Sequence, residues 1–375
     1  MRPHTGFTEL DKQAHKMVFA YVLGKMEEAS KGVEINWKGL IEGGIFEFLH
    51  RVKLTDIKPP VYHRLMKEKS EELNRWVLKS VRVHIEGIDK DFAARFERHL
   101  GNPKYHELEK RILKAAHYLA TNWEFEIIYQ LNSTIYGVDE TRTDISNQIE
   151  EHQDLVGVQK ILLRKKTHAF LDLVGQLRFQ RRWAQTPRIP ETSVLGHMLI
   201  VAMLAYFCSL QLEACDKRIY NNFFAGLFHD LPEVLTRDII SPVKNSVPGI
   251  DDIIKEIENR QLEERILPLL PVTWHEEMKY FIEDEFKSKV ILNTGRTAIT
   301  SDQINEQYNE NSYNPLDGEL IKACDMLAAY AEASLSIEYG ITSPHLTSAH
   351  KTMFENNDYK RVAGLDFTPL FEYFV

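Results

Sequence analysis

A histidine and an aspartate stand side by side at the end of an apolar segment, as His229 and Asp230. The segment before them, residues 222–228, has the apolar content of a buried helix. An imidazole or a carboxylate is costly to bury without a partner, and a metal ion removes that cost by taking both as ligands. The pair therefore indicates a metal site. Most His-Asp pairs are ordinary surface or helix-capping residues, so further ligands are needed elsewhere in the chain.

A second histidine lies in the long apolar helix predicted over residues 193–211, which Thr192 or Ser193 can cap. His197 falls in the first turns of this helix among apolar neighbours. A single histidine on an apolar face is more often a hydrogen-bonded core residue than a ligand, so its companions decide between the two interpretations.

A fourth candidate is Asp325, in the apolar face of a helix predicted over residues 318–340 and closed by Gly340. Positions 321, 328 and 329, about one turn away, carry no lysine or arginine. An unpaired buried carboxylate is costly, and a metal ion would resolve that cost. Another hydrogen-bonding partner or local solvent is the alternative.

The four candidate ligands predict a particular class of metal. Two imidazoles and two carboxylates suit a divalent transition metal better than Ca²⁺ or Mg²⁺. A structural zinc site is disfavoured because the set contains no cysteine. Such an ion generates hydroxide near neutral pH and acts as a Lewis acid on a phosphoryl group.

The order H…HD…D resembles the HD-domain metal-dependent phosphohydrolases. Three further strings are similar to the 5'-deoxynucleotidase branch of that superfamily: Arg182-Trp183, ETSVLGH over residues 191–197, and HDLPEVLTRDIISPVK over residues 229–244. That branch shows Arg-Trp, a Ser-x-x-x-His helix start, HDxxEVLTGD and a Pro-Val-Lys turn. The similarity covers roughly residues 167–340. It implies a helical HD-domain bundle with one divalent transition metal, such as Co²⁺, Mn²⁺, Ni²⁺, Fe²⁺ or Zn²⁺.

The resemblance also implies a role for each matching residue. The metal ligands would be His197, His229, Asp230 and Asp325. Glu233 would handle a proton near the attacking water or the leaving oxygen.

The substrate-binding residues follow from the same resemblance. Arg182 and Lys244 would meet the phosphate, Trp183 would pack on the base or sugar, and Asp238 would lie near the sugar edge. The structural alternatives are surface charge for the two cations and a core position for Trp183. Arg237 stands where the family usually has glycine, and it could change the substrate preference.

Composition limits the choice of partner and compartment. The chain has 375 residues, 43% hydrophobic and 27% charged, with a net charge of −9. This charge argues against a polymeric nucleic-acid partner, whereas a small phosphorylated ligand needs only a local basic pocket. The first residues lack the apolar core of a signal peptide, and the longest apolar run, Met198–Cys208, is shorter than a membrane span. Three cysteines without framework spacing fit free thiols in the cytoplasm.

Helical periodicity dominates the chain, and alternation typical of strands is nearly absent, which predicts an all-α fold. The helical stretches are residues 8–30, 36–50, 64–82, 88–99, 104–130, 250–268 and 273–291. The polar residues 297–318 lack periodicity, and we expect a mobile loop, a lid or partial disorder there. A polar, acidic run at residues 139–154 marks a boundary. The predicted domains are residues 1–145, a connection over 146–166, and a catalytic domain over 167–375.

The first half is interpreted as a degenerate copy of the second. At an offset of 182, residues 41–63 match 223–245 at six positions, including Gly44 with Gly226 and Phe46 with Phe228. The same offset places His15 opposite His197. Chance similarity between amphipathic helices is the alternative.

The copy has lost its chemistry. At the offset of 182, Glu47 stands opposite His229, Phe48 opposite Asp230, and Arg51 opposite Glu233. At an offset of 208, His117 stands opposite Asp325. We therefore expect two tandem HD-like domains, the first without a competent metal site, packed as an intramolecular pseudo-dimer. Only a convergence of His15, Glu47 and His117 would restore a second site.

Two functions from different classes remain open at this stage. The first is hydrolysis of the phosphomonoester of a (deoxy)nucleoside 5'-monophosphate by metal-activated water. The second is a nucleotide-sensing or scaffold protein that keeps the pocket without useful turnover. The intact ligand set and Glu233 favour the enzyme. Hydrolysis of a guanosine tetraphosphate-type alarmone is disfavoured, because that branch carries HDxxED where this chain has HDLPEV.

Overall fold

A computed structural model describes residues 6–374, apart from residues 56, 58, 90 and 238–246. The chain divides into two compact units. The N-terminal unit comprises Lys16–Gln159, and the C-terminal unit comprises Met1–His15 with Lys160–Val375. These bounds differ from the predicted ones, because residues 1–15 group with the second unit and the acidic run at 139–154 is largely helical within the first.

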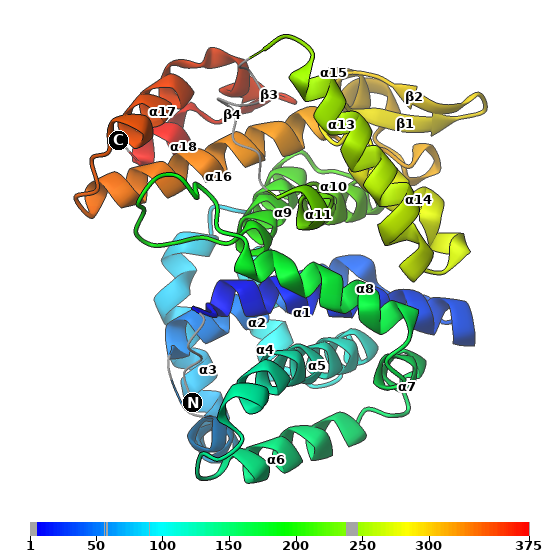
Figure 1. The fold of residues 1–375 in the computed structure, drawn as a ribbon, viewed down its shortest axis with the longest axis vertical. Coiled ribbons are helices and arrows are strands. Elements are labelled where there is room, and N and C mark those ends of the chain that lie inside the picture. Colours follow the sequence, from blue (N-terminus) through cyan, green and yellow to red (C-terminus); the bar gives the residue numbers. More distant parts are fainter. Residues whose placement is uncertain (1–5, 56, 58, 90, 238–246, 375) are drawn as a thin grey trace. The chain divides into compact units, whose positions relative to one another are not determined.

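Helices form the N-terminal unit (Figure 1). They are α2 (Trp37–Leu54), α3 (Pro59–Ile85), α4 (Phe92–Gly101), α5 (Glu107–Asn132), α6 (Val138–Glu150) and, in part, α1 (Glu9–Lys31) and α7 (Val156–Leu162). The side chain of Asn36 caps α2 by accepting a hydrogen bond from the backbone N–H of Gly39 over 2.8 Å. The core includes Phe46 of α2, whose ring stacks on Phe96 of α4 at 4.9 Å.

The C-terminal unit is also built from helices. They are α8 (Lys166–Gly175), α9 (Val194–Gln211), α10 (Asp216–Phe228), α11 (Glu233–Thr236), α13 (Ile250–Gln261), α14 (His275–Ile282), α15 (Ser301–Gln303), α16 (Gly318–Glu338), α17 (Pro344–Glu355) and α18 (Thr368–Tyr373). Short 3-10 or π segments connect them: η1 (Gln176–Phe179), η2 (Leu262–Ile266), η3 (Leu267–Leu269), η4 (Val272–Trp274), η5 (Ile304–Tyr308), η6 (Asn311–Tyr313) and η7 (Asn357–Tyr359). The predicted all-α class is confirmed.

Two small antiparallel hairpins interrupt the helical pattern. Strands β1 (Lys289–Leu292) and β2 (Gly295–Ala298) form the first, and β3 (Arg361–Val362) and β4 (Leu365–Asp366) form the second. The helix predicted over 273–291 therefore ends at Ile282. Each strand is too short to show the alternation by which strands are predicted.

The polar segment 297–318 is folded, which differs from the expected mobile loop or lid. Thr300 and Gln303 form a capping box at the start of α15. Further along, Ile304 and Leu316 are fully buried. The sequence did not predict this structure, because helix caps and a few buried side chains stabilise the segment and neither produces a periodic pattern.

Helix α9 lies at the centre of the C-terminal unit and packs against α10 and α16. Ser193 is its N-cap and accepts a hydrogen bond from the backbone N–H of Gly196 over 2.9 Å. Helix α10 approaches closely at Gly226, where a Cβ atom would lie 2.9 Å from the Cα of Ala202. Glycine is therefore needed at this crossing.

Helix α9 is long and apolar enough to cross a membrane, which differs from the expectation that the apolar run is too short. However, 67% of this segment is buried inside the structure. A helix that is apolar on all sides occurs either in a membrane or in the core of a folded unit. Burial identifies α9 as a core helix here.

The first turns of α1 complete the C-terminal unit. Asp11 accepts a hydrogen bond from the hydroxyl of Ser193 at the start of α9. His15 is fully buried, with Nε2 2.9 Å from the carbonyl oxygen of Leu171 in α8. The chain therefore contributes residues from both ends of its sequence to this unit.

Candidate metal centre

Three predicted ligands converge in the C-terminal unit. One donor atom each from His197, His229 and Asp325 lies within 4.8 Å of the other two. They come from α9, from the residue that ends α10, and from α16. Within the part of the chain that the structure describes, no other cluster of three His, Cys, Asp or Glu side chains meets this criterion.

His229 presents a nitrogen suited to a metal. Its Nδ1 donates to the carbonyl oxygen of Gly226 over 2.8 Å, one turn earlier in α10. Its Nε2 is buried, makes no hydrogen bond of good geometry and lies 3.1 Å from Oδ2 of Asp230. A proton on Nδ1 leaves the lone pair of Nε2 for a cation. Burial lowers the pKa of His229, but the neighbouring Asp230 carboxylate raises it above its usual value overall.

His197 is fully buried and lies between two carboxylates. Its Nε2 is 3.0 Å from Oδ1 of Asp325, and its Nδ1 is 3.3 Å from Oε1 of Glu332. The lone histidine of an apolar helix is therefore part of a polar cluster.

Asp325 has a cationic partner, contrary to the expectation drawn from positions 321, 328 and 329. Lys322, three residues earlier on α16, donates from Nζ to Oδ2 of Asp325 over 2.9 Å. Burial acts to raise the pKa of Asp325, but Lys322 and His197 hold it well below its usual range. That expectation did not consider position i−3. This spacing places two side chains on one helix face as well as i±4 does.

Asp230 lies beside the three converging ligands. Its Oδ2 is 3.6 Å from Nη1 of Arg182 and 3.1 Å from Nε2 of His229. Burial acts to raise the pKa of Asp230, whereas His229 and Arg182 bring it well below its usual value. The carboxylate is therefore ionised, as a metal ligand must be.

Glu233 opens α11 and is buried. Its backbone N–H donates to the carbonyl oxygen of Asp230 over 3.1 Å. This hydrogen bond closes a turn between Asp230 and Glu233.

Arg182 and Trp183 both reach the cluster. Arg182 has a side chain only 14% exposed and lies within ion-pair distance of Asp230 and Glu332, so it is not a surface charge. The indole Nε1 of Trp183 donates to Oε2 of Glu332 over 2.9 Å.

Glu332 is a residue that was missed from the sequence. It is buried, and it lies seven residues after Asp325 on α16, which places both carboxylates on one face of the helix. Burial acts to raise its pKa, but His197, Arg182 and Arg188 lower the pKa of Glu332 to about 2. The i, i+7 spacing from a candidate ligand was the signal that could have found it.

The segment after Glu233 is described only in part. The backbone of Arg237 has φ 68° and ψ 163°, a conformation that residues other than glycine rarely adopt. Glycine, which the resemblance leads us to expect at this position, adopts such a conformation without strain. Asp238 and Lys244, the other two predicted substrate contacts, lie outside the described residues.

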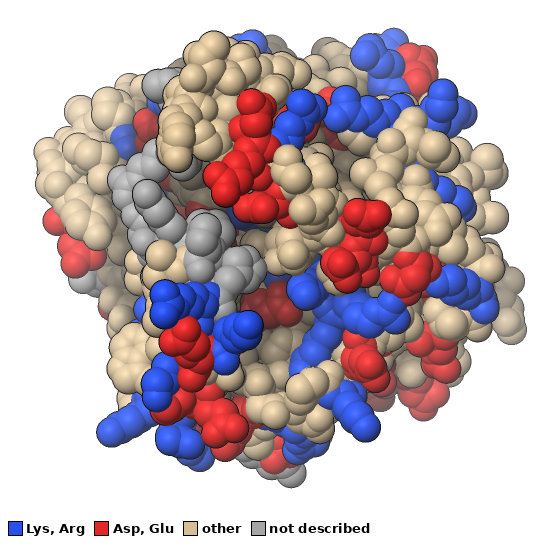
Figure 2. Space-filling model, turned by 90° about the horizontal axis from the view of Figure 1, so that it is seen from below, with Lys and Arg blue, Asp and Glu red and all other residues tan. Residues whose placement is uncertain are grey.

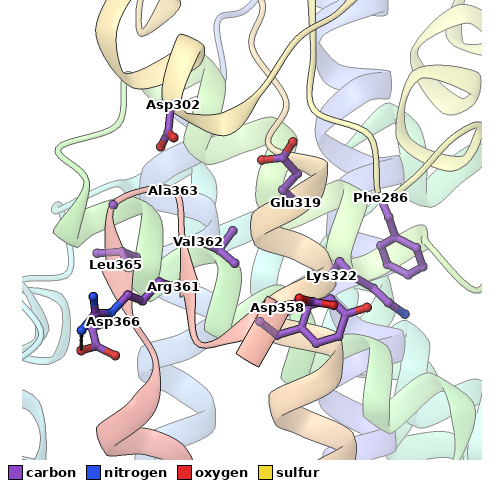
Figure 3. A pocket seen from close by; sticks show the side chains of 12 residues that line it. Phe286, Asp302, Glu319, Lys322, Asp358, Arg361, Val362, Ala363, Leu365 and Asp366 are labelled. Carbon is purple, nitrogen blue, oxygen red and sulfur yellow. Dashed lines mark ion pairs between the residues drawn. The ribbon is translucent and has the colours of Figure 1, made fainter. Parts of the chain in front are cut away.

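A cavity of about 770 Å³ adjoins the centre (Figure 3). Its walls come from α16, from Phe286, from α15, and from η7 with the hairpin β3–β4. Two of its lining residues contact candidate metal ligands: Lys322 pairs with Asp325, and the ring of Phe286 lies 6.0 Å from that of His229. The cavity therefore borders the candidate site through these two residues, within the C-terminal unit.

The donor set fits a divalent metal. Two imidazole nitrogens and two ionised carboxylates are the ligand types that first-row divalent ions accept. The buried Nε2 of His229 makes no hydrogen bond, and a cation bound there would satisfy it. His197, His229, Asp230 and Asp325 would hold the ion.

The residues that the predicted duplication aligns with the candidate site hold a different arrangement. Lys16 is buried and donates from Nζ to Oε2 of Glu47 over 2.5 Å, and Nε2 of His99 lies 3.8 Å from the other oxygen of Glu47. His15 instead contacts Leu171. Among the described residues, His15, Glu47 and His117 do not form a metal-binding group. The duplication itself stays a prediction.

The comparisons with known proteins cover the part of the chain that carries this site. Residues 174–354 match the family model of the HD domain. A 5'-deoxynucleotidase of Vibrio atlanticus is 30% identical over 121 residues, which is 32% of this chain and 61% of that protein. A 5'-deoxynucleotidase of Pasteurella multocida is 24% identical over 186 residues, 47% of this chain and 77% of that protein. One from Vibrio cholerae is 25% identical over 187 residues, 47% of this chain and 78% of that protein.

The relatives match only part of the chain. The similarity to the Vibrio atlanticus protein spans about three fifths of that protein's length. The matched family region lies within the C-terminal unit and contains all four candidate metal ligands together with Glu233. Over this region, the chain matches the HD-domain family model and is similar to proteins named 5'-deoxynucleotidases.

Proposed function

We propose that the chain is a metal-dependent phosphohydrolase that cleaves the phosphomonoester of (deoxy)nucleoside 5'-monophosphates. The observation that carries the proposal is the convergence of His197, His229 and Asp325 in a buried site with Asp230 beside them. The names of the similar proteins support the substrate class. One divalent transition metal is the proposed cofactor.

The ion, when bound, would activate a water molecule and polarise the phosphoryl group. The chain supplies the rest. Two cationic side chains border the ligands: Arg182 at Asp230, and Lys322 at Asp325. Both can bind phosphate oxygens and offset the charge that develops on them. Glu233 would hold or deliver a proton at the attacking or leaving oxygen.

The nucleoside end of the substrate is assigned from fewer contacts. We propose that Trp183 packs on the base or sugar, with its indole edge held by Glu332. Asp238 and Lys244 are proposed contacts to the sugar and phosphate by their resemblance alone, since they lie outside the described residues. A small phosphorylated nucleotide is the proposed partner.

Surface charge bears on the choice between a small nucleotide and a polymer. On the face drawn in Figure 2, Lys and Arg side chains are interspersed with Asp and Glu. A polyanion lying across this face would meet carboxylates as well as cations. We therefore keep the small-ligand assignment. Free Cys208, Cys215 and Cys324 support the proposed cytoplasmic location.

We also infer that the N-terminal unit is a degenerate HD-like domain. The ion pair between buried Lys16 and half-buried Glu47 supports this, because an ammonium group then neutralises the carboxylate that aligns with His229. The bounds 1–145 and 167–375, and the intramolecular pseudo-dimer, stay predictions.

The decisive experiment is phosphate release from a panel of nucleoside and deoxynucleoside 5'-monophosphates, each assayed with Co²⁺, Mn²⁺, Mg²⁺ and Ni²⁺. We expect turnover with at least one transition metal, and loss of it in His229→Ala. The control is His345→Ala, because His345 is exposed in α17. Nucleotide binding without turnover under all metals would instead establish the sensor or scaffold function.

A further inference from the structure

Glu332 has more contacts with the candidate site than any role given so far explains. One carboxylate oxygen, Oε1, lies 3.3 Å from Nδ1 of His197. The other, Oε2, accepts a hydrogen bond from Nε1 of Trp183 over 2.9 Å. Oε2 also lies 3.9 Å from Nε of Arg182 and 3.9 Å from Nη2 of Arg188. A single buried side chain therefore contacts both a metal ligand and the Arg182-Trp183 segment.

The contact with His197 offers an acceptor for one of its two ring nitrogens. In the structure, Nε2 faces Oδ1 of Asp325 over 3.0 Å. A metal ion bound to Nε2 and to Asp325 would leave the ring proton on Nδ1, where it can donate to the carboxylate of Glu332. A carboxylate behind a ligating histidine also fixes the ring and increases its basicity.

The second oxygen acts on the Arg182-Trp183 segment. Trp183 has φ 59°, in the left-handed region that residues other than glycine seldom adopt. Its hydrogen bond to Glu332 is a tertiary contact that can stabilise this conformation. The backbone N–H of Arg182 donates to the carbonyl oxygen of Thr192 over 2.9 Å, which ties the segment to the turn before α9.

Arg188 lies near the same oxygen of Glu332 and also contacts its backbone. Its Nη1 donates to the backbone carbonyl oxygen of Glu332 over 3.0 Å, and its Nη2 donates to the hydroxyl of Thr192 over 2.5 Å. With Arg182 it supplies the positive charge that a buried carboxylate needs. Glu332 is therefore fixed in position before any ligand arrives.

We propose that Glu332 is a positioning residue that couples the metal centre to the substrate-binding segment. It orients His197 through one oxygen and Trp183 through the other. Metal affinity and the geometry of the Arg182-Trp183 segment then depend on one another. The coupling to metal rests on the ligand assignment alone, and the link to substrate rests on the proposed function.

The first test measures metal affinity rather than turnover. Glu332→Gln preserves the shape of the side chain but removes its charge, and we expect the dissociation constant for Co²⁺ or Mn²⁺ to rise 10- to 100-fold, measured by competition with a chelating dye. Glu338→Gln is the matched control, because Glu338 is exposed on the same helix. Wild-type metal affinity in a folded Glu332→Gln variant, even with a lower melting temperature, would show a merely structural role and overturn the proposal.

The second test uses the other end of the contact and does not require Glu332 to change. Trp183→Phe keeps an aromatic ring but removes the donor to Oε2, and we expect metal affinity to fall several-fold. In the Glu332→Gln background, the same change should add little, which a double-mutant cycle measures. Fully additive effects would contradict the coupling.

These outcomes separate the inference from the proposed function. Absence of nucleotide hydrolysis in the wild-type protein would reject the function and leave the metal measurements valid. Hydrolysis that proceeds normally, together with unchanged metal affinity in both variants, would reject the role of Glu332 and retain the function.

Discussion

Lys322 donates a hydrogen bond from Nζ to Oδ2 of Asp325 over 2.9 Å, three residues along the same face of α16. The ammonium group thus lies against one oxygen of a candidate metal ligand, while His197 faces the other. A metal ion at this carboxylate would have to share it with Lys322.

This competition predicts that Lys322→Met binds metal more tightly than the wild-type chain, by about fivefold, because removing a neighbouring positive charge stabilises a bound cation by about 1 kcal/mol in a partly solvated site. Chelator competition measures the constant. Lys351→Met serves as the control, since Lys351 is exposed in α17. Weaker metal binding in Lys322→Met would show that the lysine organises Asp325 rather than competing at it.

Removal of the ligand pair should remove the metal. His229→Ala combined with Asp230→Ala is expected to lose nearly all bound transition metal, because each supplies a donor to the same buried site. Elemental analysis of the purified protein gives the stoichiometry, expected to be close to one ion per wild-type chain. An unchanged metal content in the double variant would place the ion elsewhere.

Glu233 should affect chemistry more than metal binding. We expect Glu233→Ala to keep its metal and to lose hydrolysis by about 10²-fold or more, as for a residue that transfers a proton in the transition state. Phosphate release and metal content are measured on the same preparation. Turnover at the wild-type rate would exclude Glu233 from the mechanism.

His15 predicts how stability depends on pH. Burial, with Arg178 nearby, lowers the pKa of His15 from 6.5 to about 3. The folded chain therefore keeps this imidazole neutral, whereas the unfolded chain takes up a proton below pH 6.5. Its contribution to stability is complete above pH 6.5 and is lost as the pH falls from 6.5 toward 3.

Between pH 7 and pH 5 this loss is about 2 kcal/mol. Chemical denaturation at both pH values measures it in the wild type and in His15→Gln, which can still donate to the carbonyl oxygen of Leu171. We expect the difference between the two pH values to shrink in the variant. An equal pH dependence in both proteins would assign the effect to other groups.

The N-terminal unit offers a prediction of its own. Glu47→Gln leaves the buried Lys16 without the carboxylate that neutralises it. We expect the free energy of unfolding to fall by about 2 kcal/mol, less than for a fully buried pair because Glu47 is partly exposed. Glu72→Gln, at an exposed pair with Lys69, should change little. Denaturant unfolding compares the two variants.

Much of the architecture was predictable because helices have a recognisable periodicity of apolar residues. Apolar spacing predicted the helices around His197, His229 and Asp325, and the polar residues that interrupt this spacing indicated the candidate ligands. The hairpin β1–β2 was not predictable in this way, since four-residue strands carry no measurable alternation.

The missing parts of the site depend on side chains from several elements. Lys322 could have been found by testing i−3 as well as i±4 around Asp325. The i, i+7 spacing from Asp325 places Glu332 on the same face of α16. Its contacts with His197 and Trp183 were not predictable, because they depend on which elements pack against α16, and periodicity does not supply that. From the sequence, Arg237 was only a departure from the glycine that the resemblance leads us to expect. Its dihedral angles show that the backbone there adopts a conformation that favours glycine.

Helix α1 has a consequence for how this protein can be divided. One continuous helix, Glu9–Lys31, starts in the C-terminal unit and ends in the N-terminal one. A fragment that begins at residue 160 would lack Asp11, the acceptor of the Ser193 hydroxyl at the start of the helix that carries His197. Expression of residues 160–375 alone would therefore remove a contact at the start of this helix, so the C-terminal unit depends on residues that precede the N-terminal unit in the sequence.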